Sequence, residues 1–344
     1  MIGKTMQKNA SIEMATRKNL FPSNLVVFIV ILIFTSILIL QPFLPDYETY
    51  REIYESGGGH LEVFGRDPGF VFIVQSINQI FSYEQFRAII LSLIAVLTLC
   101  VLNTLQVLSK NIFGATVIFA FIPLFFLKFG IQIREGIAIA IWFFALFGTR
   151  CRWGQLSFAL MAILSSSIHM ATAPLWLVLF LGFYFDRIPR ISFFIAIVLY
   201  AIFIHAVVNP SRLESEQFSG LNKEWVTLTL PQVIYWLSYF GFFLIFLFES
   251  NPYKNENLEN HKSIKALGFV IRAGVIGLLA GIAGQLFING FEILQKGLIA
   301  DILRIASLLL ILGCIFLAIT GKKKQAALFG LFALIDVIRI ILAA

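Results

Sequence analysis

Charged residues are scarce in this 344-residue chain. They make up 13% of it, against roughly 25% in a soluble globular protein. Hydrophobic residues make up 59%, with 37 Phe among them. Long polar segments are missing too, and the longest stretch between two expected spans is residues 43–86. These absences exclude a separate soluble domain and predict an all-α polytopic membrane protein that forms one transmembrane domain over residues 1–344.

Cysteine pairs, metal motifs and nucleotide motifs are also absent. Cys100, Cys151 and Cys314 lie in or beside apolar runs, so no disulfide framework is expected. The four histidines are scattered, and no His/Asp/Glu spacing matches a metal ligand set. No P-loop or Rossmann glycine pattern occurs, and Gly277 with Gly281 forms a GxxxG typical of close helix packing. We therefore expect no metal and no cofactor. The net charge of +7 lies in short loops, which is typical of a membrane protein and gives no reason to expect nucleic-acid binding.

Apolar runs that recur from Leu25 to the C-terminus predict about eleven transmembrane helices, since about 20 apolar residues cross a bilayer. The expected spans lie near residues 25–42, 87–108, 112–129, 132–149, 155–169, 173–185, 191–208, 232–249, 266–289, 303–320 and 325–342. A further run, residues 69–82, is too short for a span and favours a re-entrant or interfacial helix. The stretch 155–185 is expected to be two short spans that break near His169.

The distribution of Lys and Arg favours a topology with the N-terminus in the cytoplasm. If residues 69–82 do not cross, all the basic clusters lie inside, and residues 43–86 and 209–231 form the larger outside loops. A crossing at 69–82, or a single helix over 155–185, would place basic clusters outside. The clusters that decide this are Arg150 with Arg152, Arg187 with Arg190, and Lys322-Lys323-Lys324.

The first outside loop contains a short predicted helix. Pro45-Asp46 predicts its start and Gly57-Gly58-Gly59 its end. Tyr47, Tyr50 and Tyr54 then fall on one face. Two interpretations are open: a surface helix with its tyrosines at the lipid headgroups, or an aromatic face that stacks on sugars.

Arginines at membrane depth are the strongest functional signal. Arg134, followed by Glu135, begins an apolar run, and Arg87 begins another. An Arg in a membrane costs about 3 kcal/mol on insertion scales, so it normally has an anionic partner. Glu135 and Asp67 are candidates, and an anionic ligand such as a diphosphate is another, since a guanidinium matches phosphate oxygens.

Other polar groups gather near the same outer level. His169 lies at the predicted break, after three serines, which makes it a candidate catalytic or ligand-binding residue. Two Asp/Arg pairs have the i, i+3 spacing of one helix face, where they can neutralise each other. These pairs are Asp301 with Arg304 and Asp336 with Arg339.

Four motifs in order resemble the EpsG-type branch of the Wzy polysaccharide polymerase family, over roughly residues 20–185. They are Asp46-x3-Tyr50-x3-Tyr54, Asp67-Pro68-Gly69-Phe70, Ile133-Arg134-Glu135-Gly136-Ile137-Ala138 and Ile168-His169-x-Ala171. The chain departs from the family pattern at two positions. Asp67 stands where the family usually has Glu, and Glu135 stands where it usually has Gln.

The resemblance implies a metal-independent glycosyltransferase with a helical bundle of the GT-C kind, in the bacterial cytoplasmic membrane. Such enzymes join repeat units linked to undecaprenyl diphosphate, at the outer face of the membrane, into an exopolysaccharide, capsule or O-antigen. Chain-length regulator and flippase proteins are the expected partners. The implied catalytic residues are Arg134, His169 and Asp67, and the implied substrate-binding residues are Glu135, Asp46, Tyr50 and Tyr54. Arg87 and Arg304 lie outside the four motifs, and we expect them to bind substrate because they are basic residues at the same outer level.

In this chemistry the arginines hold the leaving diphosphate. His169 or a carboxylate takes the proton of the acceptor hydroxyl. Two other functions remain open. A lipid-linked sugar flippase would also need buried charges, and a membrane acyltransferase that modifies surface sugars would also use a histidine.

Overall fold

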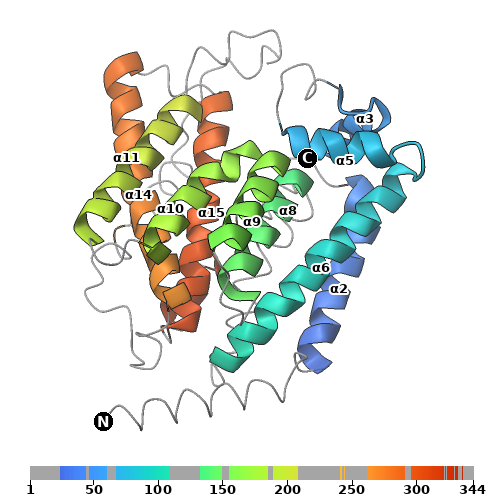
Figure 1. The fold of residues 1–344 in the computed structure, drawn as a ribbon, viewed down its shortest axis with the longest axis horizontal. Helices are drawn as coiled ribbons and strands as arrows, with labels where there is room; N and C mark the ends of the chain where they lie inside the picture. Colours follow the sequence, from blue (N-terminus) through green and yellow to red (C-terminus); the bar gives the residue numbers. More distant parts are fainter. Residues whose placement is uncertain are drawn as a thin grey trace. The chain divides into compact units, whose positions relative to one another are not determined.

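The computed structural model shows a helical protein (Figure 1). It describes residues 24–43, 46–59, 67–108, 132–148, 155–184, 189–207, 262–290 and 296–320, residues 241 and 244, and several residues between 322 and 335. No strand occurs in these segments. The chain divides into two compact units, one of residues 1–114, 125–170 and 344, the other of residues 115–124 and 171–343. The single transmembrane domain stays a prediction.

The first unit is built around a long helix, α6, which packs against α2, α8 and the π-helical turn η3 that extends α8 (Figure 1). Two short helices, α3 and α5, lie at the N-terminal end of α6, and α5 packs against α9. The bounds of these elements are α2 Asn24–Leu40, η1 Gln41–Phe43, α3 Tyr47–Glu55, α5 Pro68–Ile77, α6 Tyr83–Leu108, α8 Ile133–Phe143, η3 Phe144–Gly148 and α9 Gln155–Ile168.

In the second unit α14 packs against all three of its neighbours. The elements are α10 Ala173–Tyr184, α11 Pro189–Val207, α14 Lys262–Asn289 and α15 Lys296–Ile319, while η4 (Met170–Thr172) joins α9 to α10. The GxxxG glycines of α14 face α11. A Cβ at Gly277 would lie 2.4 Å from Cβ of Tyr200, and one at Gly281 would lie 2.6 Å from Cβ of Ile204. The prediction of close helix packing at these glycines is confirmed.

Two described helical segments are long and apolar enough to cross a membrane, Tyr83–Leu102 and Ser263–Asn289. Shorter apolar helices occur at most of the other expected spans, including Leu156–Ile168 and Arg190–His205. The expected spans 112–129, 232–249 and 325–342 lie wholly or mostly outside the described residues. The number of about eleven spans therefore stays a prediction.

Three local predictions are confirmed. The stretch 155–185 breaks at His169, which lies between the end of α9 and the 3-10 turn that leads into α10. The helix expected after Pro45-Asp46 is α3, and three glycines with positive φ, at 67°, 117° and 49°, follow it. The expected short helix after Asp67 is α5. Its 10 residues extend about 15 Å, half the bilayer core of about 30 Å.

The tyrosine face of α3 points into the protein. Tyr47, Tyr50 and Tyr54 are 6%, 7% and 3% exposed. Tyr54 stacks on Phe86 with ring centroids 4.7 Å apart and donates a hydrogen bond to the Phe81 carbonyl at 2.8 Å. This burial contradicts both the headgroup and the sugar-stacking interpretation of the face. Aromatic packing on α6 offers the tyrosines more buried area than a membrane surface would. A substrate-binding role for Tyr50 and Tyr54 stays a prediction.

Candidate functional site

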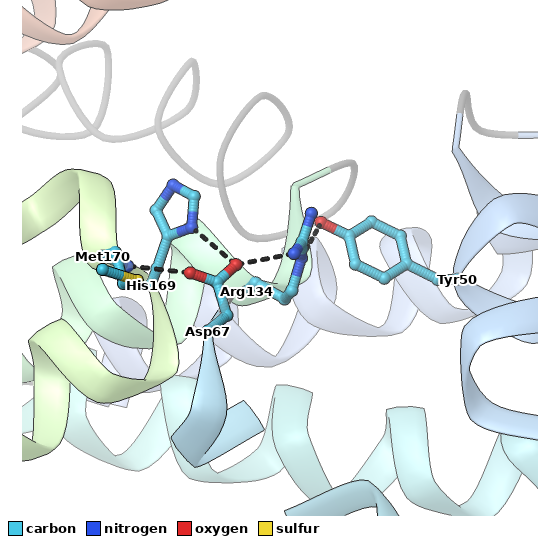
Figure 2. A network of polar contacts seen from close by, with 5 residues as sticks. All are labelled: Tyr50, Asp67, Arg134, His169 and Met170. Atoms are coloured by element: carbon cyan, nitrogen blue, oxygen red, sulfur yellow. Dashed lines mark hydrogen bonds and ion pairs between the residues drawn. The ribbon is translucent and has the colours of Figure 1, made fainter. Parts of the chain in front are cut away.

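Asp67 lies at the centre of a polar network at the N-terminus of α5 (Figure 2). Its Oδ2 accepts a hydrogen bond from Nη1 of Arg134 at 2.6 Å and lies 3.3 Å from Nδ1 of His169. Its Oδ1 accepts from the main-chain N–H of Met170 at 2.8 Å. One buried carboxylate thus joins α5, α8 and the break after α9.

The backbone of Asp67 explains why its carboxylate is available. Asp67 caps α5 with φ 50° and ψ 54°, and its side chain makes no capping hydrogen bond. The left-handed conformation costs an ordinary residue about 1–2 kcal/mol and is tolerated best by Gly, Asn and Asp. A capping aspartate usually accepts from its own helix. Here the main-chain carbonyl accepts from Phe70 N–H at 2.9 Å and leaves the carboxylate to its three partners.

Arg134, in the first turn of α8, is held between Asp67 and two aromatic rings. Its Nε donates to the Tyr50 hydroxyl at 3.4 Å. The guanidinium carbon lies 5.5 Å from the centroid of the Tyr50 ring and 5.9 Å from that of Phe70. Both distances are within the range of cation–π attraction. The anionic partner that Arg134 requires is therefore Asp67, one of the candidates from the sequence.

His169 lies at the break between α9 and η4, with its side chain 21% exposed. Its main-chain N–H still donates to the Ser165 carbonyl at 3.0 Å, as in a continuing helix. Because an ionised carboxylate only accepts, Nδ1 of His169 carries the proton that faces Asp67. In a neutral ring, Nε2 then has a lone pair with which to accept a proton.

The surroundings of Asp67 favour its ionised form. Burial by itself raises the pKa of this carboxyl group. The hydrogen bond and charge of His169, the charge of Arg134 and the Met170 N–H outweigh burial, so the pKa of Asp67 lies below its ordinary value. The carboxylate is therefore charged at neutral pH.

Close packing between α5 and α9 fixes the distance from Asp67 to His169. A Cβ at Gly69 would lie 2.4 Å from Oγ of Ser167 and 2.9 Å from its main-chain carbonyl carbon, so only glycine fits there. The Ser165 hydroxyl, fully buried, donates to the Ala138 carbonyl of α8 at 2.9 Å. These contacts hold the three elements of the site together.

The other candidates lie outside this network. Arg87 is 0% exposed, donates to the Tyr83 hydroxyl at 3.0 Å and has its guanidinium 5.5 Å from the Tyr47 ring centroid. Asp46 is exposed and caps α3, also in the left-handed conformation.

Glu135 is half-buried on α8. Asp301 and Arg304 belong to α15, with side chains outside the described part, and Asp336 and Arg339 lie outside the described residues. The substrate-binding roles expected for Arg87, Asp46, Glu135 and Arg304 stay predictions.

Two members of the site were not predicted. Phe70 contacts the Arg134 guanidinium, and its place in the Asp67-Pro68-Gly69-Phe70 motif was the available signal. The main-chain N–H of Met170 could not be predicted from residue type, because every residue except proline has this group. A helix break does free such groups, since the first N–H groups of a new helical turn have no partner within it.

Together these groups can bind an anion and move a proton. A half-buried Arg and a half-buried imidazole flank one buried carboxylate (Figure 2). In the segments that the structure describes, no three His, Cys, Asp or Glu side chains cluster as metal ligands would.

Comparisons with known proteins extend the resemblance over nearly the whole chain. A family model described as the EpsG family matches residues 24–342. Neither the curated proteins nor the solved structures gave a match.

Proposed function

This chain belongs to the EpsG family of helical membrane proteins, and we propose that it is a polysaccharide polymerase of the cytoplasmic membrane. In this proposal it joins oligosaccharide repeat units carried on undecaprenyl diphosphate, at the outer face of the membrane. Family membership supports the general activity, and the network around Asp67 supports the specific chemistry.

The single observation behind this proposal is the row of His169, Asp67 and Arg134. Transfer of a sugar chain from a diphosphate needs positive charge on the leaving group, because that group departs as an anion. We assign this task to Arg134. It also needs a base for the attacking hydroxyl, and we assign that task to Nε2 of His169. Asp67 orients both groups.

The proposed step is a single displacement. The acceptor hydroxyl of one lipid-linked unit attacks the anomeric carbon of the donor chain, and a new C–O bond forms. The bond between that carbon and the diphosphate oxygen breaks, and its electron pair leaves with the diphosphate. The hydroxyl proton passes to His169, whose Nδ1–H faces the Asp67 carboxylate.

The experiment is reconstitution of the full-length protein in detergent with a synthetic lipid-linked repeat unit and EDTA. We expect a ladder of lengthened lipid-linked products from the wild type. The matched control is the Arg134→Ala variant, which should give none. Absence of lengthened product from folded wild-type protein would refute a metal-independent polymerase. Sugar translocation without elongation would favour a flippase instead.

A further inference from the structure

The hydroxyl of Tyr50 is a second polar group beside Arg134. It lies on the side of Arg134 away from Asp67 (Figure 2). Tyr50 is 7% exposed, and its ring meets Phe70 edge-on, with centroids 6.3 Å apart and planes at 71°. These contacts fix the ring, so the hydroxyl is held in place next to the guanidinium.

The proton of this hydroxyl points away from Arg134. The Nε–H of Arg134 donates to the Tyr50 oxygen at 3.4 Å, and a guanidinium has no lone pair with which to accept. Burial raises the pKa of Tyr50, although Arg134 opposes this, so the phenol keeps its proton at neutral pH. Within the described part of the chain, no group accepts that proton.

Arg134 has a further hydrogen-bond donor, Nη2, besides the two that Tyr50 and Asp67 use. Its Nη1 is used by Asp67 and its Nε by Tyr50, and Nη2 has no partner among the residues that the structure describes. The Tyr50 hydroxyl and Nη2 are therefore two neighbouring donors. Phosphate oxygens accept hydrogen bonds from such donors strongly, above all from a charged guanidinium.

We propose that the Tyr50 hydroxyl donates a hydrogen bond to the diphosphate of the lipid-linked donor, beside Nη2 of Arg134. This inference rests on the proposed function for the identity of the ligand. It gives Tyr50 a direct contact with substrate, in place of the sugar stacking that its burial rules out. The ring and the hydroxyl oxygen hold Arg134, and the hydroxyl proton contacts the diphosphate.

Tyr50→Phe keeps the ring against Arg134 and Phe70 and removes the hydroxyl, which is the proposed donor to the diphosphate and also accepts the long hydrogen bond from Nε of Arg134. Tyr47→Phe is the matched control. Tyr47 lies one turn earlier on the same buried face, and its hydroxyl contacts Glu84 at 3.3 Å. Both variants lose one buried hydroxyl from α3, and only one of them alters the proposed contact.

The measurement is calorimetric binding of farnesyl diphosphate to full-length protein in detergent, with farnesol as the uncharged reference ligand. We expect Tyr50→Phe to weaken binding by roughly tenfold to a hundredfold, as for a lost hydrogen bond to a charged group. Tyr47→Phe should bind as the wild type does, and farnesol should not distinguish the three proteins.

Equal affinities of wild type and Tyr50→Phe would overturn this inference, as would a wild type that binds farnesyl diphosphate no better than farnesol. Binding does not require turnover. If the protein fails to elongate repeat units while Tyr50→Phe still weakens binding of farnesyl diphosphate, that pair of results would support the diphosphate site and refute only the polymerase activity.

Discussion

At the residue scale, the site depends on one carboxylate shared by two nitrogen groups. Oδ2 of Asp67 faces both Nη1 of Arg134 and Nδ1 of His169. Removing Arg134 leaves the buried Asp67 carboxylate without its main charge partner, which destabilises the fold. Activity and local stability are therefore coupled here, and each variant must be compared at matched levels of folded protein.

Arg134 should be intolerant of replacement. Lys keeps the positive charge but offers one ammonium group, which cannot reach Asp67, Tyr50 and a phosphate together as the planar guanidinium can. We expect Arg134→Lys to lose most polymerisation and Arg134→Ala to lose at least about a hundredfold in rate. Polymer length and turnover at matched membrane levels provide the measurement. If Arg134→Ala made polymer of the same length and at the same rate as the wild type, the proposed site would be refuted.

His169 should show a graded response. His169→Ala removes the proposed base and should lower turnover by about a hundredfold or more. His169→Gln can still donate a hydrogen bond to Asp67, so it should be milder if the ring only donates. Rates for both variants decide between a base and a donor. Equal, severe losses favour the base, while near-normal rates from both would exclude His169 from the chemistry.

Asp67 should also give stability a specific dependence on pH. Its folded-state pKa is below the ordinary value of 3.8. Its charge therefore stabilises the fold fully above that value, and this contribution is lost as pH falls through the lower, folded-state pKa. We expect wild type to have a higher unfolding temperature in detergent than Asp67→Asn at pH 6. The difference between the two temperatures should shrink at pH values below about 3.8. A difference that is constant with pH would contradict this.

At the element scale, the site depends on the close approach of α5 and α9. Gly69 lies against Ser167, two residues before His169, and a side chain there would push α5 outward. Asp67 begins this same helix, so any such shift changes its distance to His169. A displacement of about 1 Å can cost a hundredfold in rate even without loss of a catalytic group.

Gly69→Ala should therefore impair catalysis through geometry. We expect a clear fall in turnover and a lower unfolding temperature, since the added Cβ would overlap Ser167. Gly284→Ala is the control, because no atom of the described residues lies within 4 Å of a Cβ at that position of α14. Alanine there should be neutral or slightly stabilising in a helix. Equal behaviour of the two variants would show that the α5–α9 contact does not position the site.

The elements differ in how far the sequence could predict them. Apolar runs, Pro68 and the glycines after α3 act locally, so the helices α3 and α5 followed from residue types, whereas the break near His169 followed from the distribution of Lys and Arg over the later loops. The pairing of Arg134 with Asp67 was a candidate because a buried charge needs a partner. The direction of the tyrosine face was not predictable. Periodicity shows that residues share a face, and only tertiary packing decides what covers it.

At the scale of the whole molecule, the site is useful to a polymerase only if it lies on the outer side of the membrane. The side follows from the basic loops, which predict that residues 43–86 stay outside and that 69–82 does not cross. The structure is compatible in one respect: α5 has 10 residues, and a helix needs about 20 to span the hydrocarbon core.

Cysteine accessibility measures this topology directly. We expect His60→Cys and Glu84→Cys, each made in a variant without native cysteines, to react with a membrane-impermeant thiol reagent in intact cells. Glu84 is exposed at the start of α6, so burial would not mask a cysteine there.

The internal control is a variant that retains only Cys151, between Arg150 and Arg152, in a loop expected to lie inside. It should react only after permeabilisation. If position 84 reacts only after permeabilisation while positions 60 and 151 react in intact cells, then residues 69–82 cross the membrane. Every later loop would change sides, His169 would face the cytoplasm, and an outer-face polymerase site built on Asp67, Arg134 and His169 would be excluded.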